Sequence, residues 1–235
     1  MKILDPISKI FDGSIIKFRD RESAAEMLYS RLKNKLIKIP SNEIVILGIP
    51  RGGMLLGDII ATKLRYQFHI VIPRKLEAPN NKELSIGGIM KDNTLYLDTL
   101  IIKTLEITDK YLKMEKEVQL KEINIRENLF GQQIEGDRIR GKNIVLVDDG
   151  VATGATLIVA SRWIRKYKPK NLTIAIPVCP KPVIKVLSEE VDMIESIITP
   201  YSSNFKTVEG FYNNFEQLTN EKLTNISKKY RLGFD

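Results

Sequence analysis

The stretch Ile144–Thr156, IVLVDDGVATGAT, decides the fold. Its first four residues, Ile144–Val147, are aliphatic or β-branched and predict a buried parallel strand. Asp148 and Asp149 follow at the carboxyl end of that strand, and a turn of small residues then leads into a helix predicted over residues 156–167. Because ligands of open α/β sheets bind at the carboxyl ends of the strands, this turn is where we expect a ligand.

The turn combines donors for an anion with two carboxylates. A Gly- and Thr-rich turn entering a helix offers unpaired N–H groups and the positive end of the helix dipole, which suit a phosphate. Asp148 and Asp149 are able to accept hydrogen bonds from sugar hydroxyls, or to hold a cation together with the phosphates. The stretch has neither the Lys-Ser/Thr pair of a Walker A loop nor a Gly-x-Gly-x-x-Gly motif. Any single residue would fit an ordinary strand–turn–helix joint, but the complete run predicts a phosphorylated sugar as the ligand.

Two other strand ends carry residues suited to anions. A predicted strand at residues 44–49 runs into Pro50-Arg51-Gly52-Gly53. The glycines there allow the backbone to approach a ligand closely, and Arg51 offers a fork of donors for phosphate oxygens. A predicted strand at residues 68–72 is followed by the cation pair Arg74-Lys75. Taken alone, PRGG fits a plain turn about as well as an anion site, and Arg74-Lys75 fits a solvated pair about as well. Both motifs follow predicted strands, however, as Asp148 and Asp149 do.

Strands and helices alternate along the whole chain, which predicts an α/β protein with a doubly wound, mainly parallel sheet. Residues 77–84, with Pro79-Asn80-Asn81 at their tip, are predicted to form a mobile loop over the site. The helix at 108–129 is predicted to cover the core, with an apolar side formed by Ile107, Tyr111, Met114, Val118, Ile125 and Leu129. Further strands are predicted at 172–178 and 193–198, an antiparallel pair at 85–90 and 94–97, and further helices at 20–36, 54–63, 183–187 and 221–230.

The composition is that of a globular protein. The chain has 235 residues, enough to bury a full core, with 43% hydrophobic and 28% charged residues. No apolar run reaches the length of a membrane span, and the first residues, MKILDPISKIFDG, lack the apolar core of a signal peptide. The single cysteine, Cys179, and the single histidine, His69, are predicted to be structural. The net charge of +8 permits nucleic-acid binding and also suits an anionic small-molecule substrate. Because the lysines are scattered, a solvated, mildly basic surface is favoured.

Together these motifs resemble those of the type I phosphoribosyltransferases. IVLVDDGVATGAT is similar to the family's signature for phosphoribosyl diphosphate (PRPP), in which a short apolar strand, two acidic residues and a Thr/Gly/Ala turn follow one another. Gly150 and Ala152 depart from the common form of that signature. The stretches FRDRESAAEML, ILGIPRGG, IPRKLEAPNNKELSIGGIM, IAIPVCP and FKTVEGFYNNF extend the resemblance over roughly residues 17–220, to a prokaryotic subfamily of predicted phosphoribosyltransferases.

The resemblance implies a type I phosphoribosyltransferase fold in a single domain over residues 1–235, with a small hood within residues 180–235. It implies transfer of the 5-phosphoribosyl group of PRPP to a nitrogen acceptor, such as a nucleobase, with release of pyrophosphate. Mg²⁺ is expected to be held mainly by PRPP, near Asp148 and Asp149, with no direct protein ligand. The protein is expected to be cytoplasmic and to form a homo-oligomer, namely a dimer. Neither a nucleic acid nor a membrane is expected as a partner.

The same resemblance assigns roles to individual residues. It makes Asp148, Asp149, Arg74 and Lys75 the catalytic residues, the first two at the ribose hydroxyls and the last two at the pyrophosphate. The loop for the 5′-phosphate comprises Gly150, Val151, Ala152, Thr153, Gly154, Ala155 and Thr156. The loop for the pyrophosphate comprises Pro50, Arg51, Gly52 and Gly53. Loops of this second kind commonly contain a non-proline cis peptide, which we expect between Pro50 and Gly53.

Two other functions stay open at this point. One is a non-enzymatic sensor of PRPP or nucleotides with the same fold, able to bind nucleic acid through a basic face; the other is a hydrolase of phosphosugars. Arg74-Lys75 and the loop at 77–84 favour the enzyme, and no helix-turn-helix pattern supports the sensor. The acceptor is not indicated. The aromatic residues of the tail fit either ordinary packing or stacking on a base; they are Tyr201, Phe205, Phe211, Tyr212 and Phe215.

Overall fold

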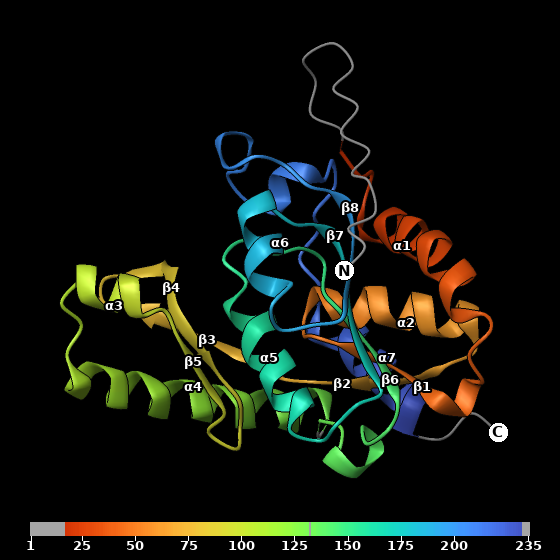
Figure 1. The fold of residues 1–235 in the computed structure, drawn as a ribbon, viewed down its shortest axis with the longest axis horizontal. Helices are drawn as coiled ribbons and strands as arrows, with labels where there is room; N and C mark the ends of the chain where they lie inside the picture. The colour runs from red at the N-terminus through yellow and green to blue at the C-terminus, as the bar shows by residue number, and fades with distance from the viewer. Residues whose placement is uncertain (1–16, 132, 232–235) are drawn as a thin grey trace.

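The structure is a computed structural model that describes residues 17–131 and 133–231. Two stretches discussed above lie outside these ranges: residues 1–13, on which the prediction about a signal peptide rests, and residues 232–235 of the region in which a hood is expected. Figure 1 shows a central sheet flanked by helices, with a second, smaller sheet projecting to one side.

The central sheet has five strands, all of them parallel. They are β1 (Ile44–Gly48), β2 (Gln67–Ile70), β6 (Asn143–Val147), β7 (Asn171–Val178) and β8 (Met193–Ile198), and they lie in the order β2-β1-β6-β7-β8. The strands β1 and β6 are buried along their whole length, as expected for strands covered on both faces. This sheet confirms the predicted α/β class with a mainly parallel, doubly wound arrangement.

Helices cover both faces of the sheet. Because alternate residues of a strand point to opposite faces, Ile44 and Ile46 pack in one hydrophobic cluster, and Val45 and Leu47 in another. The first cluster includes residues of α1 (Arg21–Leu36), α2 (Gly52–Leu64) and α7 (Asn220–Arg231), and the second includes residues of α5 (Ala155–Arg165) and α6 (Lys181–Leu187). Across the described ranges, no helix is both long enough and apolar enough to span a membrane.

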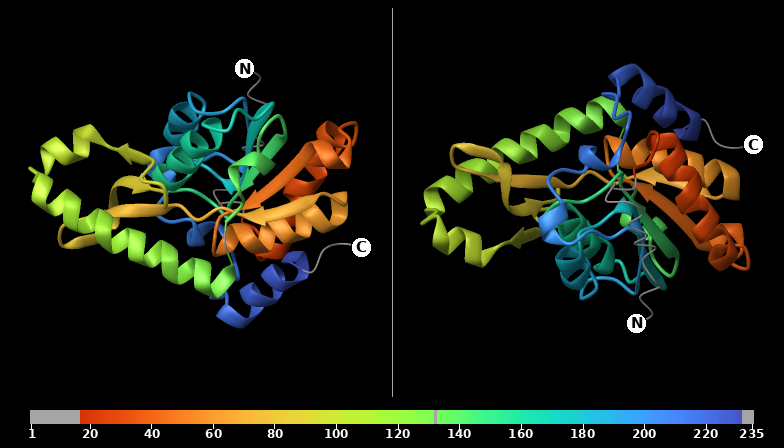
Figure 2. Two further views of the ribbon diagram at one scale, coloured as in Figure 1. Left: turned by 90° about the horizontal axis from the view of Figure 1, so that it is seen from below. Right: turned by 90° about the horizontal axis from the view of Figure 1, so that it is seen from above.

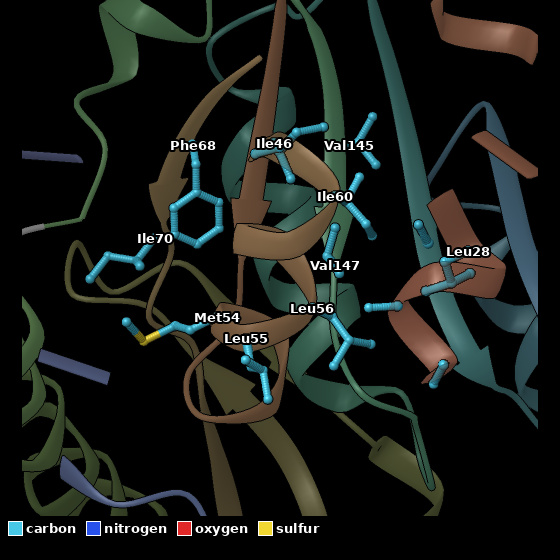
Figure 3. Close-up of a cluster of buried hydrophobic side chains, with 14 of the residues drawn as sticks. Leu28, Ile46, Met54, Leu55, Leu56, Ile60, Phe68, Ile70, Val145 and Val147 are labelled. Carbon is cyan, nitrogen blue, oxygen red and sulfur yellow. The ribbon is translucent and has the colours of Figure 1, made fainter. Parts of the chain in front are cut away.

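The first cluster holds α1 and α2 in place over the sheet. Figure 3 shows Ile60 of α2 near Ile46 of β1 and Val145 of β6, and Leu56 of α2 near Val147 of β6. The start of α1 is set by a capping box: Asp20 accepts a hydrogen bond from the backbone N–H of Ser23, and the Ser23 hydroxyl oxygen accepts one from the backbone N–H of Asp20. The cap makes Arg21 the first residue of the helix.

The second sheet is antiparallel and lies between β2 and β6 in the chain. Its strands are β3 (Arg74–Ala78), β4 (Asn81–Ile89) and β5 (Leu95–Leu97), and it is followed by α3 (Thr99–Thr104) and α4 (Asp109–Phe130). The pairing of β4 with β5 confirms the antiparallel pair predicted at residues 85–90 and 94–97. The long helix α4 packs against β3 and runs back until its end contacts α7, as Figure 2 shows.

Residues 77–84, which we predicted as a mobile loop over the site, form regular paired structure. They lie in the hairpin of β3 and β4, where Glu77 pairs with Ser85 and Ala78 pairs with Asn81. Two features favour the hairpin: alternate residues of β3, Leu76 and Ala78, are buried, and Asn80 adopts the left-handed conformation (φ +61°) that asparagine tolerates. The segment is a paired element and not an irregular lid.

The predicted apolar side of α4 is only partly buried. Ile107 and Tyr111 pack against the first hydrophobic cluster. Met114, Val118, Ile125 and Leu129 of the predicted apolar side are exposed, between 39% and 53%. The side facing β3 instead buries polar groups together with apolar ones; it comprises Leu112, Glu115, Gln119, Ile123, Glu127 and Phe130. Polar residues are buried there because they have partners: Glu115, for example, accepts a hydrogen bond of 2.9 Å from the backbone N–H of Glu77.

The chain between β8 and α7 crosses the carboxyl ends of the central strands. It is largely irregular, with short 3-10 helices η3 (Ser202–Asn204) and η4 (Glu209–Phe211), and others occur earlier as η1 (Ser41–Glu43) and η2 (Gly136–Arg138). Residues 208–218, which we call the crossing segment, contact the amino-terminal part of the described chain. There, Phe18 donates its backbone N–H to the carbonyl of Phe211, and its ring packs against Tyr212.

Candidate active site

The structure brings two of the predicted loops together at the carboxyl ends of β1 and β6. These strands are neighbours in register, with Gly48 opposite Val147. A Cβ atom added at Gly52 would lie 2.0 Å from Asp149 Oδ2, and one added at Gly53 would lie 2.2 Å from the Val147 carbonyl oxygen. A Cβ at Gly53 would overlap backbone atoms, and one at Gly52 would displace the Asp149 side chain, which explains the two glycines of the PRGG loop. The peptide bond between Pro50 and Arg51 is cis, as predicted for this loop.

The loop predicted for a 5′-phosphate also follows β6. Gly154 takes a left-handed conformation (φ +88°) as the N-cap of α5, and no side chain of the described residues caps the first turn of that helix. The helix begins at Ala155, one residue before the predicted start. Ala152 and Thr153 are exposed, Thr156 is half-buried, and the N–H of Val151 is taken by the carbonyl of Val178. The uncapped N–H groups at the start of α5 are therefore available to an anion.

The carboxylate of Asp149 has a partner that we did not predict. Arg21 Nε donates to Asp149 Oδ2 at 2.6 Å, and these two side chains are only 10% and 16% exposed. Arg21 also donates to the carbonyl of Glu216 at 2.6 Å and lies 3.5 Å from the ring centroid of Phe215. The hydroxyl of Tyr212 donates to the backbone carbonyl of Asp149 at 2.6 Å. The crossing segment and α1 together fix the position of Asp149.

Asp148 lies in a different electrostatic environment. Desolvation and the neighbouring Asp149 carboxylate raise the pKa of Asp148 well above its usual value. The backbone N–H groups of Asp149 and Gly53 oppose this rise, and the first of them donates to Asp148 Oδ1 at 2.9 Å. The two carboxylates are thus inequivalent: Asp149 has a cation as partner, whereas Asp148 has backbone donors. Removing a proton from Asp148 is correspondingly harder than from an ordinary aspartate.

The predicted cation pair Arg74-Lys75 is divided between the two faces of β3. Consecutive residues of a strand point to opposite faces, and Arg74 Nε donates to Gln119 Oε1 of α4 at 2.9 Å. Lys75 lies opposite Gly88 of β4, a glycine whose added Cβ would meet the carbonyl oxygen of Ala155 at 2.7 Å. Lys75 is therefore on the side of the hairpin that faces α5, and its Nζ donates to the carbonyl of Lys82 at 2.6 Å.

Two arginines near the site were missed at the level of sequence. Arg21 lies in the first turn of α1, where the helix dipole disfavours a cation. A cation at this unfavourable position indicates that its side chain has a partner elsewhere in the fold, and this was the signal that the sequence offered. Arg126 of α4 donates to the carbonyl of Pro50 at 3.2 Å, and nothing local in the sequence marks it.

The single histidine and the single cysteine fit the structural roles predicted for them. Burial lowers the pKa of His69 to about 4, and it raises the pKa of the Cys179 thiol to about 12. Both side chains are therefore neutral near pH 7. In the part of the chain that the structure describes, no group of three or more His, Cys, Asp and Glu side chains is placed to hold a metal ion.

Comparisons with known proteins agree with this architecture. Two curated relatives, from Mycobacterium tuberculosis strains CDC 1551 / Oshkosh and ATCC 25618 / H37Rv, are 27% identical over 206 residues, and each carries the name "Putative phosphoribosyl transferase". The match covers 88% of this chain but only 45% of each relative, so the chain spans about half of their length. The crystal structure of TT1426 from Thermus thermophilus superposes with a TM-score of 0.70 at 27% identity, covering 92% of this chain and 99% of that one.

A family model also matches most of the chain. The model described as "Phosphoribosyl transferase domain" matches residues 20–214, from the N-cap of α1 to the crossing segment. The matched region contains both sheets, the acidic pair and the PRGG loop. The chain belongs to the phosphoribosyl transferase domain family.

Proposed function

We propose that this chain binds PRPP with Mg²⁺ and transfers its 5-phosphoribosyl group to a nitrogen acceptor, with release of pyrophosphate. One observation carries the proposal: in a member of this family, Asp148 and Asp149 lie between the uncapped start of α5 and the PRGG loop. Anion donors thus flank two carboxylates on either side. A sugar that carries a phosphate at one end and a diphosphate at the other matches that order of groups.

The 5′-phosphate is assigned to residues 150–156. A charge at an exposed helix terminus is stabilised by only about 0.3–1 kcal/mol, so hydrogen bonds must supply most of the affinity. The backbone N–H groups of the first turn of α5 and the hydroxyls of Thr153 and Thr156 are the donors available. Ala152 has no side-chain hydroxyl, so only its backbone N–H is able to donate to the phosphate at that position.

The residues present suit a Mg²⁺ ion that arrives with the substrate. Mg²⁺ keeps several waters and binds through one or two carboxylates plus substrate phosphates, not in an all-protein cage. Asp148 and Asp149 are the two carboxylates at the strand end, and Asp149 is already paired with Arg21. The ion would therefore take most of its ligands from PRPP and water. When bound, the ion neutralises charge on the pyrophosphate oxygens.

The chain's own residues perform the remaining tasks. The acceptor nitrogen forms a bond to C1 of the ribose as the bond from C1 to the pyrophosphate oxygen breaks, through a state with oxocarbenium character. A proton carried by that nitrogen is released to water. Asp148 and Asp149 hold the ribose hydroxyls and offset the developing positive charge, while Arg51 and Arg74 receive the negative charge of the leaving group. Because Arg21 and Tyr212 fix Asp149 before substrate arrives, little reorganisation is needed at that carboxylate.

A panel of nucleobases incubated with PRPP and Mg²⁺, with pyrophosphate release as the readout, tests the proposal. We expect release that depends on one base or a small group of bases, because a transferase needs an acceptor. PRPP binding without release for any base, together with salt-dependent binding to DNA or RNA, would support the sensor instead. Consumption of PRPP without any acceptor would support a hydrolase.

A further inference from the structure

The long helix α4 contacts the site at three places along one side. Gln119, Arg126 and Phe130 are spaced by seven and four residues and so share one face of the helix. Gln119 accepts the hydrogen bond from Arg74, Arg126 donates to the carbonyl of Pro50, and the Phe130 ring centroid lies 5.9 Å from the Arg51 guanidinium. Arg126 therefore lies between Arg51 and Arg74, although each of the three comes from a different element.

Within the described part of the chain, none of these three guanidinium groups forms an ion pair, although Glu77, Glu115 and Glu122 lie near enough to attract Arg74. Arg51 donates to the carbonyl of Leu218 at 2.8 Å, so each of the three bonds a neutral acceptor. Over residues 17–131 and 133–231, none of the three forms an ion pair with a carboxylate. A guanidinium has further N–H donors beyond the one used here, and it cannot lose its charge by deprotonation near neutral pH. Their positive charge and remaining donors are available to a ligand.

At Arg126, burial and the repulsion from neighbouring cations are not fully offset by the nearby carboxylates. Desolvation and the nearby charges of Arg74 and Arg51 lower the pKa of Arg126 to about 10. Glu122 on the same helix opposes this effect and, like Asp148, attracts Arg126 without pairing with it. A polyanion between the three groups would remove the repulsion and use the free donors, and a diphosphate has the charge and the number of oxygens to do so.

We propose that Arg126 joins Arg51 and Arg74 in binding the pyrophosphate group, as a ligand supplied by α4. The inference rests on the proposed function for its place in a reaction, because pyrophosphate is the group that leaves PRPP. All the site residues predicted from the sequence follow one of three predicted strands, whereas Arg126 lies on the helix α4. Binding by Arg126 gives α4 a role at the site, in addition to packing against the second sheet.

Calorimetric titration with inorganic pyrophosphate and Mg²⁺, and separately with ribose 5-phosphate, tests this role. Arg126→Gln keeps an N–H donor for the Pro50 carbonyl but removes the charge. We expect its affinity for pyrophosphate to fall about tenfold to a hundredfold, as for loss of a hydrogen bond to a charged group, and its affinity for ribose 5-phosphate to change by less than about twofold. Arg126→Lys keeps the charge and should retain more affinity than the glutamine variant.

Lys121→Gln is the matched control, since Lys121 is an exposed cation on the same helix. We expect it to bind both ligands as the wild-type chain does. Unchanged pyrophosphate affinity in Arg126→Gln would overturn the inference, and so would an equal loss for both ligands, because that result indicates a general distortion of the site. A wild-type chain that binds pyrophosphate but neither PRPP nor ribose 5-phosphate would overturn the proposed function while leaving the arginine cluster as an anion site.

Discussion

An Arg21→Met variant is expected to lose about 3 kcal/mol of unfolding free energy. The change removes the partner of Asp149 from a pair whose side chains are 10% and 16% exposed, and removing one partner of a buried ion pair leaves an uncompensated charge. The hydrogen bond to the Glu216 carbonyl and the contact with the Phe215 ring are lost as well. Urea denaturation of the two proteins measures the difference.

A double-mutant cycle separates the ion pair from the other contacts of Arg21. In Arg21→Met/Asp149→Asn the unpaired charge is gone, so the double variant should be more stable than the sum of the single losses predicts, by about 2 kcal/mol. Arg162→Met is the matched control, because the Arg162 side chain is 44% exposed and its pair with Glu190 is partly solvated. We expect that variant to lose less than about 1 kcal/mol. Equal losses of unfolding free energy for Arg21→Met and Arg162→Met would show that the buried Arg21–Asp149 pair stabilises the fold no more than the exposed Arg162–Glu190 pair.

Gly53→Ala is the second change with a large expected effect. The new methyl group would lie 2.2 Å from the Val147 carbonyl oxygen and 3.0 Å from Asp148 Cα, both of them backbone atoms. Rotation of a side chain cannot relieve this overlap, so the PRGG loop must move away from β6. We expect a destabilisation of about 3 kcal/mol, at the upper end for overpacking, together with loss of PRPP binding.

Thermal and urea unfolding measure this effect against Gly210→Ala. A Cβ added at Gly210 meets only Thr207 Oγ1, at an ordinary contact distance of 3.6 Å. The control variant should therefore stay within about 0.5 kcal/mol of the wild-type chain. A Gly53→Ala protein that unfolds like Gly210→Ala would mean that the close approach of the PRGG loop to β6 is wrong.

The sequence predicts the site well where the relevant residues are consecutive. The apolar runs before Asp148 and before Pro50 each indicate a strand, and the glycines that follow each run indicate a loop, by local pattern alone. That these loops meet follows from the parallel pairing of β1 with β6, a long-range contact that no local pattern encodes. We expected the loops to meet because ligands of open α/β sheets bind at the carboxyl ends of the strands.

The features that sequence reasoning missed depend on side chains far apart in the chain. Arg21 and Asp149 are separated by 128 positions. Arg126 belongs to a helix whose apolar pattern indicated the buried side only in part, because Glu115 and Gln119 are buried by their hydrogen bonds and not by hydrophobicity. Periodicity reports where apolar residues lie, and it fails where polar partners decide which face is covered.

Calorimetric titration with PRPP and Mg²⁺ tests the central claim most directly, namely that the acidic pair and its two loops bind this sugar phosphate. The comparison is between the wild-type chain and Asp148→Asn/Asp149→Asn, with melting curves to confirm that the variant is folded. We predict saturable binding by the wild-type chain and a loss of at least about a hundredfold in affinity for the variant, since both carboxyl groups that accept hydrogen bonds from the ribose hydroxyls are removed. No binding by the folded wild-type chain, or equal affinity in the two proteins, would contradict the account.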